Sequence, residues 1–191
     1  MVLAAPDWST IHLPSGPSSA RSLPPCRAVG RPEGLVVDAT AGLGGDAFLL
    51  AVAGYEVLAI ERNPHVFAAL QQGLRRALED AKLARWLGGR LRVVEGDARQ
   101  LLRELEDVAA VHVDPMFPAK KKKALPPKNM QELRRLVGED LDSRELLEAA
   151  CAVAPRVAVK RPRTASPLLE GPEAVIRGKL VRYDVYLRRN S

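Results

Sequence analysis

Residues 35–50 read LVVDATAGLGGDAFLL, and this stretch decides the fold of the chain. It opens with a short apolar run rich in valine, which is typical of a strand buried on both faces. A glycine-rich turn follows, and then an apolar segment over residues 47–53 that Gly54 can end as a helix. Strand, glycine turn and helix form the opening unit of a doubly wound α/β domain, whose ligand lies over the amino-terminal end of the helix.

The glycine turn is compatible with two classes of ligand. Residues 42–47 fit the G-x-G-x-x-G/A pattern of dinucleotide sites, and Glu61 follows at about the offset of a ribose contact. Two features argue against a dinucleotide: Asp38 ends the strand before three intervening residues, and Asp46 would compete with a pyrophosphate for the helix amino terminus. S-adenosylmethionine carries an ammonium and a sulfonium but no phosphate, so two carboxylates suit it better.

The length of 191 residues predicts one domain over residues 34–191, preceded by an arm over residues 1–33. The arm holds six prolines and little periodicity, and is expected to be irregular, with one short strand over residues 8–13. The net charge of +6 and the pI near 9.6 reach the basic range of nucleic-acid-binding proteins.

The composition also bears on the compartment. Cys26 and Cys151 have neither a metal-binding spacing nor a disulfide framework, so both are expected to be reduced. No apolar run is long enough to cross a bilayer, and no signal peptide is recognisable, so the cytoplasm is the expected location. We expect neither a membrane nor a metal among the partners of this chain.

Acidic residues follow the predicted strands at their carboxyl ends. Asp38, Glu61 and Asp114 each end a strand, and Asp97 lies just beyond another. Because the carboxyl ends of parallel strands share one edge of a sheet, these four acids are predicted to form one site. His112, inside the last of these strands, is expected to be a packed residue rather than a catalyst. The strands that follow the glycine turn are predicted over residues 56–61, 90–95 and 108–114.

The sequence Asp114-Pro115-Met116-Phe117-Pro118 directly follows one of these strands. The carboxylate of Asp114 and the carbonyl groups beside Pro115 are acceptors that can hold an exocyclic amino group. Phe117 offers a face on which an unpaired base can stack. This turn therefore predicts methyl transfer to an amino group on a base, with Asp114, Pro115 and Phe117 in the catalytic site.

Basic residues adjoin the predicted base pocket in two places. Five of the eight lysines of the chain fall within nine residues, directly after the proline-rich turn. A further basic cluster ends the next predicted strand, over residues 157–160. Both clusters are predicted to contact RNA phosphates or base edges. The predicted RNA contacts are Lys120, Lys121, Lys122, Lys123, Lys128, Lys160 and Arg161.

Two closing strands, over residues 173–177 and 182–187, are predicted to be antiparallel. A reversed terminal hairpin is common in methyltransferase versions of the doubly wound sheet. The predicted fold is therefore α/β, with a doubly wound, mostly parallel sheet of the Rossmann-like methyltransferase type and a carboxy-terminal antiparallel hairpin.

With these motifs assembled, the sequence from residue 34 onward resembles the ribosomal RNA small subunit methyltransferase J family. Members transfer a methyl group from S-adenosylmethionine to N2 of a guanine in small-subunit ribosomal RNA, and they carry a longer folded region ahead of the glycine strand. The resemblance implies ribosomal RNA or the small ribosomal subunit as the partner. It rests on residues 38–46, 61–64, 114–118 and the lysines after them, 137–142 and 159–162.

The resemblance also implies cofactor contacts. By position, these fall on Gly45, Asp46, Glu61, Arg62, Asp97, Ala98 and Asp114. Within such a site, Asp38, Gly42 and Gly44 are expected to shape the methionine end. Glu61 is expected to contact the ribose and Asp97 the adenine amine.

Three alternatives compete with a guanine-N2 methyltransferase. An adenine-N6 methyltransferase acting on DNA or RNA also uses an acid-Pro-x-aromatic turn. A nicotinamide-dependent oxidoreductase would use the glycines of residues 42–47, but it leaves the proline-rich turn and the lysines without a role. A non-catalytic RNA-binding protein could retain the fold, although every proposed site position is filled.

Overall fold

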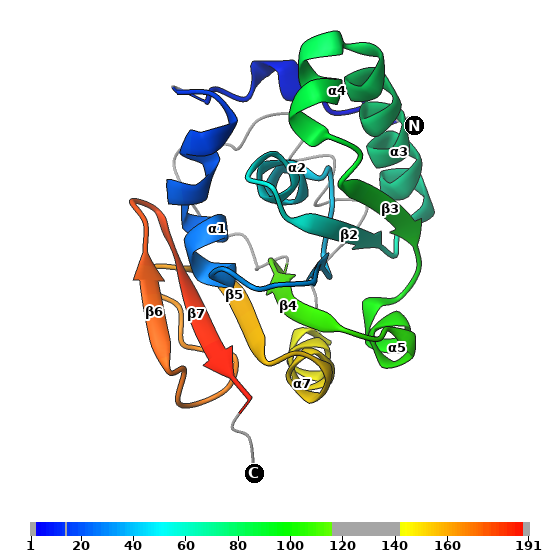
Figure 1. The fold of residues 1–191 in the computed structure, drawn as a ribbon. Helices are drawn as coiled ribbons and strands as arrows, with labels where there is room; N and C mark the ends of the chain where they lie inside the picture. Colours follow the sequence, from blue (N-terminus) through cyan, green and yellow to red (C-terminus); the bar gives the residue numbers. More distant parts are fainter. Residues whose placement is uncertain (1–2, 14, 116–141, 189–191) are drawn as a thin grey trace, which may run out of the picture.

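A seven-stranded sheet lies at the centre of the described part of the chain (Figure 1). The structure is a computed structural model, and it describes residues 3–13, 15–115 and 142–188. The strands lie in the order β3-β2-β1-β4-β5-β7-β6 across the sheet. Their bounds are β1 Leu35–Asp38, β2 Glu56–Glu61, β3 Leu91–Glu95, β4 Val108–Val113, β5 Arg156–Pro162, β6 Ala174–Arg177 and β7 Val181–Leu187.

The strands β1 to β5 are parallel, whereas β7 pairs antiparallel with both β5 and β6. From β1 the chain proceeds to β2 and β3 on one side, and then to β4 and β5 on the other. Doubly wound sheets bind ligands at such a switch, outside the carboxyl ends of the strands. The predicted fold is confirmed, and the predicted strand ends lie within two residues of those observed.

Helices cover both faces of the sheet (Figure 1). The buried apolar side chains form two clusters. The first cluster packs under α1, α2, α3 and α4, and the second cluster packs under α5 and α7. The fully buried Val36 and Val37 of β1 belong to the first and second cluster respectively, so β1 is buried on both faces, as predicted. The helices are η1 Trp8–Thr10, η2 Pro17–Ser22, α1 Pro24–Val29, α2 Gly45–Val52, α3 Pro64–Glu79, α4 Ala81–Leu87, α5 Ala98–Leu101, η3 Leu102–Glu104 and α7 Ser143–Val153.

Local capping explains where α3 and α4 begin. The side chain of Asn63 accepts hydrogen bonds from the first backbone N–H groups of α3, and Pro64 occupies a position that needs no donor. The side chain of Asp80 caps α4 in the same way, and Gly88 ends that helix with a φ of 55°. The helix α4 was not predicted, because only Leu83 and Leu87 of its short span are buried.

The structure of the amino-terminal segment differs from the expected irregular arm. It contains η1, η2 and α1, and the predicted strand is wrong, because Trp8–Thr10 forms a 3-10 helix. Trp8, Leu13 and Ala20 are buried in the same core cluster as α2. The expected division into an arm and a domain at residue 34 stays a prediction. Among the described residues, no helix is long and apolar enough to cross a membrane.

Candidate active site

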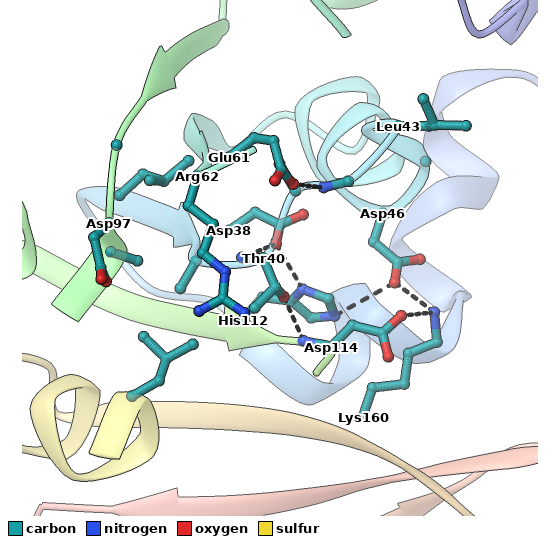
Figure 2. Close-up of a pocket in the computed structure, with 18 of the residues that line it drawn as sticks. Asp38, Thr40, Leu43, Asp46, Glu61, Arg62, Asp97, His112, Asp114 and Lys160 are labelled. Carbon is teal, nitrogen blue, oxygen red and sulfur yellow. Dashed lines mark hydrogen bonds and ion pairs between the residues drawn. The ribbon is translucent and has the colours of Figure 1, made fainter. Parts of the chain in front are cut away.

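A cavity of about 370 Å³ opens at the carboxyl ends of β1, β2, β4 and β5 (Figure 2). Its volume is in the range of about 300–1,000 Å³ that is typical of ligand sites. Residues at the starts of α5 and α7 and residues of the amino-terminal segment complete its wall. Its charged and hydroxyl-bearing lining residues are Asp7, Asp38, Thr40, Asp46, Glu61, Arg62, Asp97, Arg99, His112, Asp114, Asp142, Ser143 and Lys160.

The ends of β1 and β4 are joined by hydrogen bonds at the cavity floor. Asp38 is buried, and its Oδ1 accepts a hydrogen bond from the backbone N–H of Thr40 at 3.2 Å. The hydroxyl oxygen of Thr40 in turn accepts from the backbone N–H of Asp114 at 2.6 Å. These bonds hold Asp114 in a fixed position relative to the glycine turn.

Glu61 holds the glycine turn against the end of β2. Its Oε2 accepts from the backbone N–H of Gly42, and its Oε1 from that of Asn63, both at 2.8 Å. Burial raises the pKa of Glu61, while the two N–H donors act in the opposite direction. A carboxylate accepts about four hydrogen bonds in all, so Glu61 retains acceptor capacity for a ribose.

Gly44 faces the core rather than the cavity, and its expected role at the methionine end stays a prediction. Its φ is 75°, and a Cβ there would lie 2.5 Å from Leu70 and 2.8 Å from Trp8. Trp8 stacks on Phe48 and donates from its indole Nε1 to the backbone carbonyl of Leu43 at 3.2 Å. The absence of a side chain at residue 44 therefore makes room for Trp8.

The amino-terminal segment contributes directly to the site. Pro6, Asp7 and Trp8 line the cavity beside the glycine turn. This contribution was missed because no motif of the sequence marks the segment. The one available signal was a lone tryptophan among polar residues.

Five charged or titratable side chains form a connected chain at the cavity floor (Figure 2). His112 lies with Nδ1 3.3 Å from Asp38 and with Nε2 3.5 Å from Asp46. The Nζ of Lys160 lies 2.7 Å from Asp46 and 2.8 Å from Asp114. One lysine thus joins the carboxylate at the start of α2 to the carboxylate that ends β4.

These contacts shift the pKa values of the connected side chains. Burial opposes the charge on His112, but Asp38 and Asp46 together raise the pKa of the imidazole. Burial raises the pKa of Asp114, and Lys160 limits that rise. For Asp46 the balance is reversed, because His112 and Lys160 outweigh burial and lower its pKa. Burial disfavours the charge on Lys160, yet Asp114 and Asp46 raise its pKa.

A second ion-pair network closes the opposite side of the cavity. The side chain of Asp97 caps α5, and Arg99 lies 2.6 Å from it. The hydrogen bond from Arg99 lowers the pKa of Asp97. Asp142 receives both Arg99 at 3.0 Å and Arg62 at 2.7 Å. The ends of β2 and β3 are thereby connected to the start of α7.

The structure brings together most of the predicted cofactor residues. Pro115 is buried next to Asp114 and does not line the cavity. Phe117 and the lysines at 120–123 and 128 lie outside the described residues. The predicted cofactor residues that line the cavity are Asp38, Gly42, Gly45, Asp46, Glu61, Arg62, Asp97, Ala98 and Asp114.

The basic residues at the end of β5, predicted to contact RNA, have partners within the protein. Lys160 lies inside the cavity, between two carboxylates. Arg161 is buried and donates to the backbone carbonyl of Ser166. His112, expected to be merely packed, lies at the cavity floor. The signal that could have found it is its parallel register opposite Asp38.

The charge of the lining fits a cationic ligand without phosphate. Seven carboxylate side chains line the cavity, against three lysine or arginine side chains. Each of those three, Arg62, Arg99 and Lys160, is already ion-paired with a carboxylate. A pyrophosphate would face this negative lining, whose three cations are already paired with carboxylates. S-adenosylmethionine instead carries positive charge that the carboxylates can bind. No group of metal-binding side chains occurs among the described residues.

Comparison with known proteins identifies the family. The family model described as "Putative SAM-dependent methyltransferase" matches residues 20–188. The ribosomal RNA small subunit methyltransferase J of Thioalkalivibrio sulfidiphilus is 48% identical, over 88% of this chain and 69% of that protein. The chain belongs to the ribosomal RNA small subunit methyltransferase J family. The protein of the same name from Chromohalobacter salexigens is 50% identical, over 81% of this chain and 63% of that protein.

A solved methyltransferase structure is also similar to this chain. A crystal structure of a S-adenosylmethionine-dependent methyltransferase from Neisseria gonorrhoeae is 35% identical, with a TM-score of 0.65. The match covers 83% of this chain and 67% of that one. The matched part of this methyltransferase J family member spans 63% to 69% of the first curated relatives.

Proposed function

We propose that this chain transfers a methyl group from S-adenosylmethionine to an exocyclic amino group of an RNA base, guanine N2 in small-subunit ribosomal RNA. The observation that carries the proposal is one cavity with a negative lining that includes Asp114, the first residue of the predicted base-binding sequence. The names of the relatives point to ribosomal RNA as the substrate. Because such RNA is cytoplasmic, we also place the activity in the cytoplasm.

The lining residues divide into binding and reacting groups. We assign Asp38, Gly42 and Asp46 to the methionine end of the cofactor, Glu61 to the ribose, and Asp97 to the adenine amine. When bound, the cofactor supplies an activated methyl group on a sulfonium, so no covalent nucleophile is needed. The protein then has to align the amine with that methyl group and exclude water.

Asp114 orients the target amine. Its carboxylate accepts a hydrogen bond from an N–H of the amino group, which aims the nitrogen lone pair away from Asp114. The ammonium of Lys160 pairs with the carboxylate of Asp114, and the hydroxyl oxygen of Thr40 accepts a hydrogen bond from the backbone N–H of Asp114. As the N–C bond forms, the bond between the sulfonium sulfur and the methyl carbon would break and S-adenosylhomocysteine would leave; the nitrogen becomes acidic and its proton passes to Asp114, from where it is lost to solvent.

Replacement of Asp114 tests the assignment. We expect Asp114→Asn and Asp114→Ala to lower methyl transfer at least about 100-fold, because neither side chain accepts the proton. The fold should survive, as judged by circular dichroism. Wild-type turnover in either variant would overturn the role of Asp114.

The competing substrate is adenine N6. Transfer of labelled methyl groups to synthetic RNA whose only amino-bearing base is guanine, and to RNA whose only amino-bearing base is adenine, separates the two activities. We expect label only in the guanine RNA. Label confined to the adenine RNA would keep the cavity assignment and replace the substrate.

A further inference from the structure

A row of arginines crosses the three strands at the edge of the sheet. Arg161 of β5 is paired with Arg182 of β7, and Arg182 is paired with Arg177 of β6. Directly paired residues point to the same face of a sheet, so the three side chains share one face. Like charges placed directly opposite one another are destabilising.

One carboxylate accompanies this row. Asp184 is buried, and its two oxygens receive Arg182 at 2.7 and 3.0 Å. Arg177 is exposed at the outer end of the row. The protein thus neutralises the middle of the row and leaves positive charge at its exposed end.

The β6–β7 turn and the residue just beyond β5 each add an exposed cation. Arg182 donates to the backbone carbonyl of Arg163 at 2.8 Å, which fixes the chain just beyond β5 to this hairpin. Arg163 and Lys179 are both exposed, and Leu180 beside them is 82% exposed. Among the residues that the structure describes, no carboxylate forms an ion pair with Arg163, Arg177 or Lys179.

The hairpin tip lies at the same edge of the sheet as the cavity. Pro162 at the end of β5 is paired with Val181 at the start of β7, so the β6–β7 turn continues past the carboxyl end of β5. Figure 1 shows this hairpin as the outer border of the sheet. Lys160 lines the cavity, and Arg163 follows it by three residues, about 10 Å along an extended chain.

We propose that Arg163, Arg177 and Lys179, the hairpin cation cluster, bind backbone phosphates of the RNA next to the target base. The inference rests on the proposed function and names the surface that holds its substrate. Arginine matches phosphate geometry with paired hydrogen bonds, and phosphate charge would relieve the repulsion along the arginine row. Exposed Leu180 can pack against a sugar or base between the phosphate contacts.

A pair of triple variants tests the cluster. Arg163→Ala, Arg177→Ala and Lys179→Ala are combined in one protein. The matched control combines Arg85→Ala, Arg92→Ala and Arg103→Ala, which removes three exposed cations that do not line the cavity. Binding of a single-stranded small-subunit ribosomal RNA fragment is measured against salt concentration for both proteins and the wild type.

We expect the cluster variant to lose about 2 units of salt slope, since each phosphate contact with single-stranded RNA contributes about 0.7. Between 50 and 200 mM salt, wild-type affinity should then fall about 16-fold more than that of the variant. The control should keep the wild-type slope, and all three proteins should bind S-adenosylhomocysteine equally. An equal loss of salt slope in the control and cluster variants, or no loss of salt slope in either, would overturn the proposal that this cluster binds phosphates. Absence of RNA binding by the wild type would instead overturn the proposed function.

Discussion

His112 lies inside the protein between Asp38 and Asp46, with Lys160 and the ring of Tyr183 as its other charged or titratable neighbours. Although burial opposes protonation, the two carboxylates raise the pKa of the imidazole above 6.5. A group with a raised pKa in the folded state stabilises the fold fully below its unfolded pKa. That contribution is lost as the pH rises through the folded pKa.

The resulting prediction concerns stability against pH. We expect the free energy of unfolding, measured with urea, to fall as the pH rises above about 6.5. His112→Asn should flatten this decline, whatever the variant's stability at any single pH. Exposed His65 of α3 provides the matched control, and His65→Asn should keep the wild-type slope. Identical slopes for the His112 and His65 variants would contradict the coupling of His112 to its carboxylates.

Lys160 shows what a sequence pattern can and cannot predict about one residue. It lies at the carboxyl end of a strand, and it lines the cavity there. Its partners, Asp46 and Asp114, lie on α2 and at the end of β4, and strand order alone brings them together. A basic residue at a strand end is therefore compatible with phosphate binding and with an internal ion pair, and only the distances decide.

At the scale of elements, the glycine turn is held from two sides. Glu61 binds its backbone from β2, and the indole of Trp8 binds the carbonyl of Leu43 from the amino-terminal segment. The turn lines the cavity between these two contacts. The amino-terminal segment therefore supports this part of the cavity although no motif marks it.

Trp8→Phe tests this support. The ring can still stack on Phe48, but the hydrogen bond to Leu43 is lost, and such a bond contributes about 0.5–1.5 kcal/mol. We expect affinity for S-adenosylhomocysteine, measured by calorimetry, to fall about 2- to 13-fold. Trp86→Phe removes the other tryptophan, which lies on α4 outside the cavity, and should leave affinity unchanged. Equal affinities in the two variants would argue against a role for the indole N–H.

The elements differ in how well sequence patterns predict them. Buried parallel strands such as β1 are short valine-rich runs, and α3 carries an apolar stripe with a cap, so their signals are local. The segment around η1 lacks any periodicity, and Trp8 is buried only because Gly44 leaves room for it. Such a contact between residues distant in sequence produces no pattern along the chain.

At the scale of the whole molecule, the parallel sheet collects the acids. Asp38, Glu61, Asp97 and Asp114 all line one cavity, and their role as one functional site stays a prediction. Their common place follows from topology, because every parallel strand ends at the same edge. The second network, in which Arg62 and Arg99 meet Asp142 at α7, depends on how the helices pack and was not predicted.

The negative cavity predicts which ligand stabilises the fold. S-adenosylhomocysteine at 100 times its Kd should stabilise the folded state by about 2.7 kcal/mol. For a domain of this size, each kcal/mol raises Tm by about 2–4 °C, so an increase of about 5–11 °C is expected. NAD carries a pyrophosphate that would meet seven lining carboxylates and three cations already ion-paired, so it should leave Tm unchanged at the same concentration. A comparable increase with NAD, or none with S-adenosylhomocysteine, would contradict the assignment of this cavity to a cofactor without phosphate.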